Sequence, residues 1–310
     1  MIARYKREFS VSLALGLLLL VLGIRRPDFF QGRNILFLVT DAAPTLIVAV
    51  GIALVIIARQ IDISVGSQLS ICVVVAGLAG RAGWSAPAAA GMAILLGAAM
   101  GCLNGLLVAF VNLPSIVVTL ATLVIFRQTL LYWGEGESIQ NLPATFQWFG
   151  AGQAVGQWLV IGISGAVLAV AMAVTNYVPA GRAIYATGSD FEAARLAGLK
   201  PKWVTFGVFI LLGGLTGLAA SLEAVRKSQL GPKLGDGLEM RVIAAAVVGG
   251  IAISGGRGRL IGCLIGVALL QTIAPALNYL GFPPEWEKAC QGLIILLAVA
   301  SDAFDRKKGH

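Results

Sequence analysis

Long apolar runs separated by short polar segments dominate the chain. Within each run the apolar character continues on every face, so the runs lack the strict alternation of a half-buried strand. A helix of about 20 apolar residues crosses the hydrocarbon core of a bilayer, whereas the strands of a membrane barrel alternate in polarity. We therefore predict an all-α polytopic membrane protein with about ten transmembrane helices. The predicted spans are 9–24, 41–59, 65–81, 87–111, 114–132, 157–178, 204–224, 239–254, 260–280 and 289–304.

An even number of spans places both termini on the same side of the membrane. The segments on the side of the N-terminus carry more Lys and Arg than the segments on the other side, and such an excess is typical of the cytoplasmic face. We therefore expect both termini to be cytoplasmic and residues 1–310 to form a single transmembrane domain.

A short sequence echo suggests internal symmetry. Gly-Cys-Leu-Asn-Gly at 101–105 returns as Gly-Cys-Leu-Ile-Gly at 262–266, five predicted spans later. An odd offset reverses the direction of the chain, which predicts an inverted repeat of spans two to five and seven to ten. The alternative is that these glycines only permit close packing of helices.

The composition limits the chemistry. Charged residues make up 12% of the 310 residues and hydrophobic residues 58%, as in a chain surrounded by lipid. The net charge of +8 is scattered over short loops without interleaved aromatic residues, so we expect no nucleic-acid partner. The four cysteines stand singly inside apolar runs, without the spacing of metal ligands, and we expect neither a metal site nor a cofactor.

One polar island, 181–202, stands between long apolar runs. Ser189 and Glu192 have the spacing of a capping box, which predicts a short helix that starts there and stops by Lys200, before Pro201. Glu192 should also pair with Arg195 on the helix surface. One face of this helix would lack bulk and permit close approach by another molecule; its residues are Ala193, Ala194, Ala197 and Gly198.

This island resembles the Glu-Ala-Ala loop of the permeases of ABC importers, in which Gly follows Glu-Ala-Ala after three residues. The resemblance implies a cytoplasmic coupling loop at about 179–203 that docks onto a separate ATP-hydrolysing subunit. The residues that would make this contact are Ser189, Glu192, Ala193, Ala194, Arg195 and Gly198. The Leu-Pro expected further on is absent, since 208–211 reads Val-Phe-Ile-Leu. A connecting helix without a partner is the alternative.

A second motif is more specific. Residues 61–67, Ile-Asp-Ile-Ser-Val-Gly-Ser, resemble the signature of the ribose-type sugar permeases of ABC importers, with Asp62, Ser64, Gly66 and Ser67 as its polar and small positions. Further stretches at 103–114, 181–186 and 243–258 agree with the same family. The segment 237–241 is closer to the autoinducer-2 and rhamnose permeases. Independently of the family, Asp62 is suited to cap the third span or to pair with Arg59.

Polar residues elsewhere suggest a path and an outer docking surface. Residues inside spans that would line a path, or instead hold helices together, are Asn104, Thr119, Thr122, Gln128, Gln271 and Asn278. In outer segments, Glu135 and Glu137 with Arg226 and Lys227 would offer a patch of both signs. By resemblance the partner there is a periplasmic substrate-binding protein, and a solvated loop is the alternative. We expect Arg127 to snorkel outward and Glu223 to meet Arg226.

These observations predict a permease subunit of an ABC importer for a sugar or sugar-like small molecule in the bacterial inner membrane. Its partners would be an ABC ATPase, a second copy or a homologous permease, the binding protein and the lipid bilayer. The chain has no phosphate-binding loop, because no Lys-Ser or Lys-Thr follows the glycines at 255–258, so we expect no enzyme activity and ATP on the separate subunit. The rival is an ion-coupled secondary transporter, which would have paired carboxylates, or a carboxylate with a basic partner, near mid-membrane; we expect no such pair there. A passive channel would need no docking helix.

Overall fold

The computed structural model describes residues 6–283, 285–293 and 296. Its regular structure there is helical, apart from one isolated antiparallel bridge between Ile139 and Leu230. Within these described residues, six helices are long and apolar enough to cross a membrane: α2, α4, α5, α6, α9 and α11. The elements are α1 (Lys6–Arg25), η2 (Pro27–Phe30), α2 (Gly32–Ile57), α3 (Val65–Arg81), α4 (Ala86–Ala109), α5 (Ser115–Trp133), η3 (Gln147–Gly150), α6 (Gln153–Tyr177), α7 (Pro179–Ser189), α8 (Phe191–Leu196), α9 (Pro201–Arg226), α10 (Leu238–Val248) and α11 (Leu260–Tyr279).

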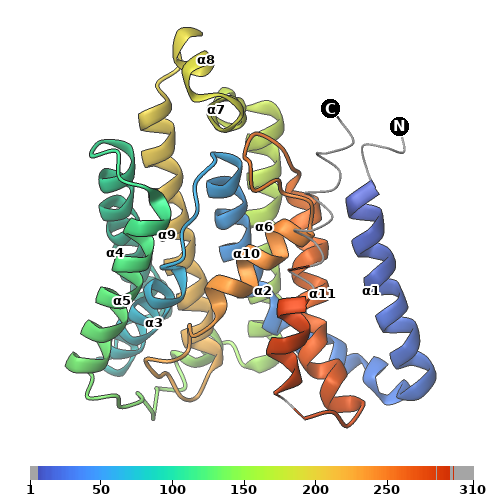
Figure 1. Cartoon of the computed structure of the whole chain (residues 1–310). Helices are drawn as coiled ribbons and strands as arrows, with labels where there is room; N and C mark the ends of the chain where they lie inside the picture. The colour runs from blue at the N-terminus through green and yellow to red at the C-terminus, as the bar shows by residue number, and fades with distance from the viewer. Residues whose placement is uncertain (1–5, 284, 294–295, 297–310) are drawn as a thin grey trace.

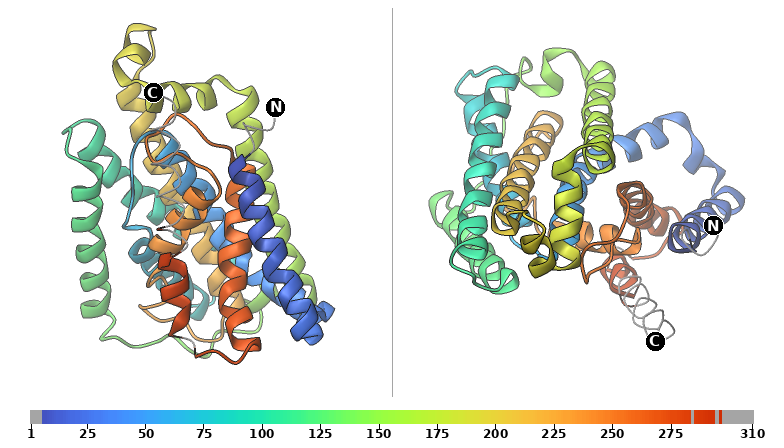
Figure 2. Two further views of the ribbon diagram at one scale, coloured as in Figure 1. Left: turned by 45° about the vertical axis from the view of Figure 1, so that its right-hand side comes forward. Right: turned by 90° about the horizontal axis from the view of Figure 1, so that it is seen from above.

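The helices form one bundle around α2 and α9, which run in opposite directions beside each other (Figure 1). Helices α3, α4 and α5 lie on one side of this pair, and α10, α11 and α1 on the other (Figure 2). The short helices α7 and α8 stand at one end of the bundle, which we call the α8 end. The long connection 134–152 and the segment 227–237 lie at the opposite end. An all-helical membrane protein is thus confirmed.

One predicted span differs from the structure. Helix α10 has 11 residues, so at 1.5 Å per residue it is about 16 Å long and too short to cross a core of about 30 Å. The chain leaves the helix at Gly249 and turns through Gly250, whose φ is +95°, a conformation that favours glycine. A complete span over 239–254 is therefore not confirmed. The tenth predicted span, 289–304, lies mostly outside the described residues.

The start of the second span was predicted too late. Helix α2 begins at Gly32, nine residues before the predicted start, although this first part contains Arg33 and Asn34. Asn34 is held by tertiary contacts: its side-chain amide donates to the Tyr279 hydroxyl at 2.8 Å and to the Asp28 carbonyl at 2.9 Å. The hydropathy of the segment does not reveal such partners.

Glycines bring the backbones of α4 and α9 into contact. A methyl group on Gly97 would collide with the carbonyl of Gly213, and one on Gly213 would collide with the carbonyl of Gly97. Gly101, in the first copy of the sequence echo, meets the Phe209 carbonyl in the same way, and Gly266, in the second, meets the Ala245 carbonyl. Close helix packing is therefore one role of the echo. The inverted repeat itself stays a prediction.

Candidate functional site

A capped helix stands exposed at the α8 end, but its cap is not the predicted one. Helix α7 continues through Ser189, and Asp190 is the N-cap of α8, with extended backbone (φ −156°, ψ 113°). The Asp190 carboxylate accepts a hydrogen bond from the Ala193 amide at 2.9 Å. The capping box of Ser189 and Glu192 is therefore wrong, because an N-cap residue needs non-helical backbone and Ser189 ends a helix.

The surface of α8 agrees better with the prediction. Arg195 forms an ion pair with Glu192, with Nη2 2.7 Å from Oε2, so this predicted pair is confirmed. Of the predicted small face, Ala194 is buried, whereas Ala193, Ala197 and Gly198 are exposed. Gly198 ends the helical segment with a φ of +85°. Beside this exposed small face Leu196 is 83% exposed, so an apolar side chain is also open to a partner.

The end of α7 touches the rest of the bundle through its main chain. The Gly256 amide donates to the carbonyl of Ile57, the last residue of α2, at 2.8 Å. A methyl group on Gly188 would collide with this same carbonyl and with the Gly256 backbone. Gly256 has a φ of +68°, a conformation that favours glycine and suits a tight turn. Because no side chain separates these segments, a displacement of α7 reaches the end of α2 directly. We call Ile57, Gly188 and Gly256 the backbone junction.

A second contact holds α7 against the same turn. The Tyr185 hydroxyl donates to the Gly258 carbonyl at 2.9 Å. Burial raises the pKa of Tyr185, so the hydroxyl keeps its proton and remains a donor at neutral pH. Helix α7 is therefore fixed to the turn by the junction and by a side-chain bond.

The signature loop follows the junction directly and forms a buried polar cluster. Asp62 Oδ1 accepts hydrogen bonds from the Ser64 amide at 2.8 Å and the Ser64 hydroxyl at 2.6 Å. Asn104 of α4 donates to Asp62 Oδ2 at 3.3 Å and to Ser64 Oγ at 2.9 Å. The Ser67 hydroxyl donates to the Ser64 carbonyl at 2.8 Å. The N-cap of α3 is Ser64, without a side-chain cap bond, so the predicted capping role of Asp62 is wrong; Asp62 instead holds the turn just before the helix.

Sequence reasoning missed Gln68 in this cluster. Its side-chain amide donates to Ser64 Oγ at 2.8 Å. Both Gln68 and Asn104 are fully buried, and the carbonyl oxygens of their side chains have no hydrogen-bond partner. Gly66 packs against the Gly235 carbonyl and Glu239. The cluster therefore joins α3, α4 and the start of α10.

The predicted path residues lie in separate places. Asn104 belongs to the signature-loop cluster. Thr119 and Thr122 are buried in α5, where their hydroxyls donate to carbonyls of their own helix at 2.8 Å and 3.3 Å. Gln128 is exposed. Gln271 and Asn278 both line a cavity in the half of the bundle away from α8.

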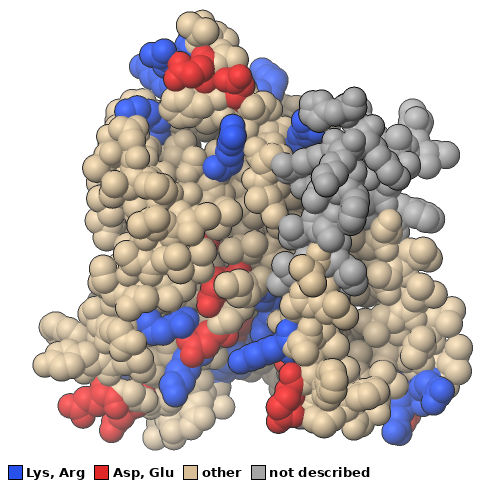
Figure 3. Space-filling view, viewed as in Figure 1, with Lys and Arg blue, Asp and Glu red and all other residues tan. Residues whose placement is uncertain are grey.

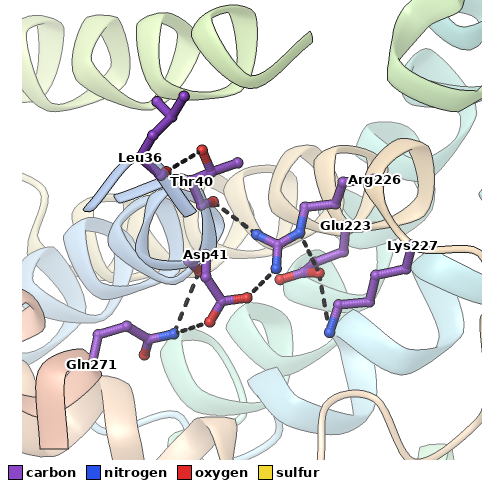
Figure 4. Close-up of polar contacts among 7 residues, drawn as sticks. All are labelled: Leu36, Thr40, Asp41, Glu223, Arg226, Lys227 and Gln271. Carbon is purple, nitrogen blue, oxygen red and sulfur yellow. Dashed lines mark hydrogen bonds and ion pairs between the residues drawn. The ribbon is translucent and has the colours of Figure 1, made fainter. Parts of the chain in front are cut away.

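Charged residues inside the helices form an ion-pair network (Figure 4). Arg226 at the end of α9 pairs with Asp41 of α2 and donates to the Thr40 carbonyl at 2.7 Å. Glu223 Oε2 lies 3.5 Å from both Arg226 Nε and Lys227 Nζ, which confirms the expected contact of Glu223 with Arg226. The Arg226 side chain is only 7% exposed. It is therefore withdrawn from the predicted docking patch, in which Glu135 and Glu137 remain exposed.

A second group of charges lies beside α10. Arg127 does not snorkel but reaches Asp236 at 3.1 Å and Glu239 at 3.9 Å. Side chains of both signs gather in the lower middle of the face in Figure 3. Arg226 and Arg127 lie toward the ends of α9 and α5, so the expectation that no such pair lies near mid-membrane stays a prediction. The sequence does not reveal Asp41 as a paired residue, because the predicted span begins at that position. It does not reveal the contact of Glu239 either, because Arg127 lies more than a hundred residues away in the sequence.

The cavity has a volume of about 560 Å³ and lies between α2, α11, Phe282 and Glu287. Its polar lining residues are Asn34, Asp41, Arg241, Gln271, Asn278 and Glu287. A smaller cavity of about 90 Å³ shares Asp41, Arg241 and Gln271 with it and continues toward Glu223 and Asp236.

Comparison with known proteins gives consistent relatives. Residues 34–299 match the family described as the branched-chain amino acid transport system / permease component. The chain is 35% identical over 300 residues to the autoinducer 2 import system permease protein LsrC of Escherichia coli (strain K12 / DH10B), covering 96% of this chain and 86% of that protein. The protein of the same name from Salmonella typhi is 35% identical over 297 residues, covering 96% and 85%. No solved structure matches the chain.

Proposed function

Because the chain belongs to the branched-chain amino acid transport system / permease component family, we propose that it carries a sugar-like small molecule across the inner membrane, driven by a separate ATPase. It is a permease of an import system rather than an ion-coupled transporter, as its relatives indicate. The named relatives import autoinducer 2, which favours a sugar-like solute over the branched-chain amino acids of the family description.

The backbone junction is the observation that carries this proposal. The exposed helix α8 offers Glu192, a small face and Leu196 to a docking protein. The junction connects α7 and α8 to the end of α2, which leads directly into the signature loop. A cytoplasmic ATPase that moves α8 would therefore move α2 and the loop together, which suits alternating access.

The opposite end suits a binding protein outside the cell membrane. Loop 134–152 is tied to the segment 227–237, since Ile139 and Leu230 exchange backbone hydrogen bonds of 2.8 Å and 3.0 Å. Glu135 and Glu137 are exposed on this loop. With the α8 end in the cytoplasm, as the distribution of Lys and Arg favours, this end faces the periplasm. A second permease copy, or a homologous permease, would complete the path.

The test reverses the charge of one exposed glutamate at each end of the bundle. Glu192→Arg should abolish retention of the ATPase during purification in detergent, because it reverses the charge at the centre of the docking surface. Glu137→Arg is the matched control, an exposed Glu→Arg exchange at the other end, and should retain the ATPase but lose stimulation by the binding protein. If wild type retains no ATPase, or if both variants retain it equally, the proposal fails.

A further inference from the structure

We infer that the cavity between α2 and α11 is a binding site for the transported solute and that it selects an uncharged molecule rich in hydroxyl groups. This inference rests on the proposed function. Its volume of about 560 Å³ falls in the range of about 300–1,000 Å³ that is usual for small-molecule sites. Aromatic walls, which include Phe29, Phe37 and Tyr279, surround a few converging polar groups, as such sites require.

The cavity lies in the half of the bundle away from α8. Asp41 is nine residues from the start of α2, and Gln271 eight residues from the end of α11. Asp41 pairs with Arg226, the last residue of α9, so the cavity borders the end of that helix. A solute that enters from the end of the bundle opposite α8 would reach this cavity.

The charges around the cavity cancel in pairs. Asp41 is neutralised by Arg226, and Arg241 lies 3.6 Å from Glu287. A cation or an anion entering the cavity would lose its hydration without finding an unmatched counter-charge, which is costly. A neutral solute avoids this cost. The pairing therefore disfavours ions and zwitterions.

Several hydrogen-bonding atoms are available to hydroxyl groups. Pro275 lacks the amide that would bond the Gln271 carbonyl, so that carbonyl is released from the helical pattern beside the cavity. Asn278 is exposed toward the same space and contributes a donor and an acceptor. A hydroxyl both donates and accepts, so it can pair with each of these atoms.

The test measures protection of a single cysteine by solute. In a permease whose four native cysteines are replaced, Ala274→Cys places a thiol in the cavity wall, and Ser138→Cys places one in the distant loop as the control position. We expect ribose or rhamnose, at about ten times its Kd, to slow maleimide labelling at position 274 about tenfold. Labelling at position 138 should not change, and L-leucine should protect neither position.

Two variants make the result specific. Asn278→Leu, which removes a side chain without protein hydrogen bonds, should abolish protection at position 274, whereas Thr272→Val, next to the wall but bonded to its own helix, should retain it. Protection by leucine as strong as by the sugars, protection that survives Asn278→Leu, or no protection by any neutral polyol would overturn the inference. ATPase retention measured in the same preparations reports on the proposed function separately.

Discussion

Arg226 supplies the hydrogen bond that Pro44 removes from Thr40. A helical carbonyl normally accepts from the amide four residues later, but residue 44 is proline and has no amide hydrogen. The Arg226 guanidinium donates to the Thr40 carbonyl at 2.7 Å and also pairs with Asp41. One side chain of α9 thus compensates both a broken helical bond and a partly buried carboxylate of α2.

Replacing Arg226 should therefore destabilise the protein strongly. Arg226→Met leaves the Asp41 carboxylate and the Thr40 carbonyl without this donor, and we expect a loss of about 2–3 kcal/mol, toward the low end for a broken buried pair because Asp41 is partly exposed. Thermal unfolding in detergent measures the change. Lys227→Met, which removes the neighbouring charge from a more exposed side chain, should cost less than about 0.5 kcal/mol. Equal losses would contradict this account.

Gly188→Ala should leave docking of the ATPase intact but reduce transport. The added methyl group collides with the Ile57 carbonyl and must displace α7 from α2. We expect the ATPase to be retained, since α8 is unchanged, while transport in proteoliposomes falls at least about tenfold, as for a displaced coupling element. Gly207→Ala is the control, because a methyl group there meets nothing within 4 Å. Normal transport by Gly188→Ala would exclude the junction as the route of coupling.

The N-cap of α8 can be tested by comparing substitutions at Asp190 and at its neighbour Ser189. Asp190→Ala removes the bond to the Ala193 amide and should destabilise the helix by about 1 kcal/mol, which weakens ATPase binding about fivefold. Ser189→Ala should leave α8 capped and the affinity unchanged. Titration of the purified permease with the ATPase measures both. If Ser189→Ala weakened ATPase binding more than Asp190→Ala, the capping box of Ser189 and Glu192 would be supported instead.

Replacing the Asp62 carboxylate by an amide should destabilise the polar cluster of the signature loop. Asp62 accepts bonds from two donors of Ser64 and one of Asn104, so Asp62→Asn would place an NH₂ group against donors. We expect a loss of about 1–3 kcal/mol in the free energy of unfolding. Ser67→Ala, which removes only one hydroxyl bond to a backbone carbonyl, should cost about 1 kcal/mol. If Asp62→Asn is no worse than Ser67→Ala, the cluster does not depend on the carboxylate.

The sequence predicted what depends on local pattern and missed what depends on distant partners. Apolar runs located most helices because burial in lipid is a property of a segment. The pair of Glu192 and Arg195 is local and was predicted. Arg226 with Asp41, and Arg127 with Asp236, join residues far apart in the sequence, and no periodicity marks them. Asp190 was passed over because Ser189 and Glu192 offered an equally good cap, and only the continuation of α7 decides between them.

The short helix α10 also constrains how the protein is assembled in the membrane. A helix of 11 residues leaves its terminal amides and carbonyls at a depth where lipid offers no hydrogen bonds, so it requires protein walls. Helix α11 provides the most extensive of these walls, and α2 and α3 provide others. Helices α2 and α3 precede α10 in the chain and leave the ribosome first, so synthesis from the N-terminus prepares one part of the receiving surface before α10 arrives, and α11 completes it afterwards. Exchanging the order of the two halves would deprive α10 of that surface during insertion.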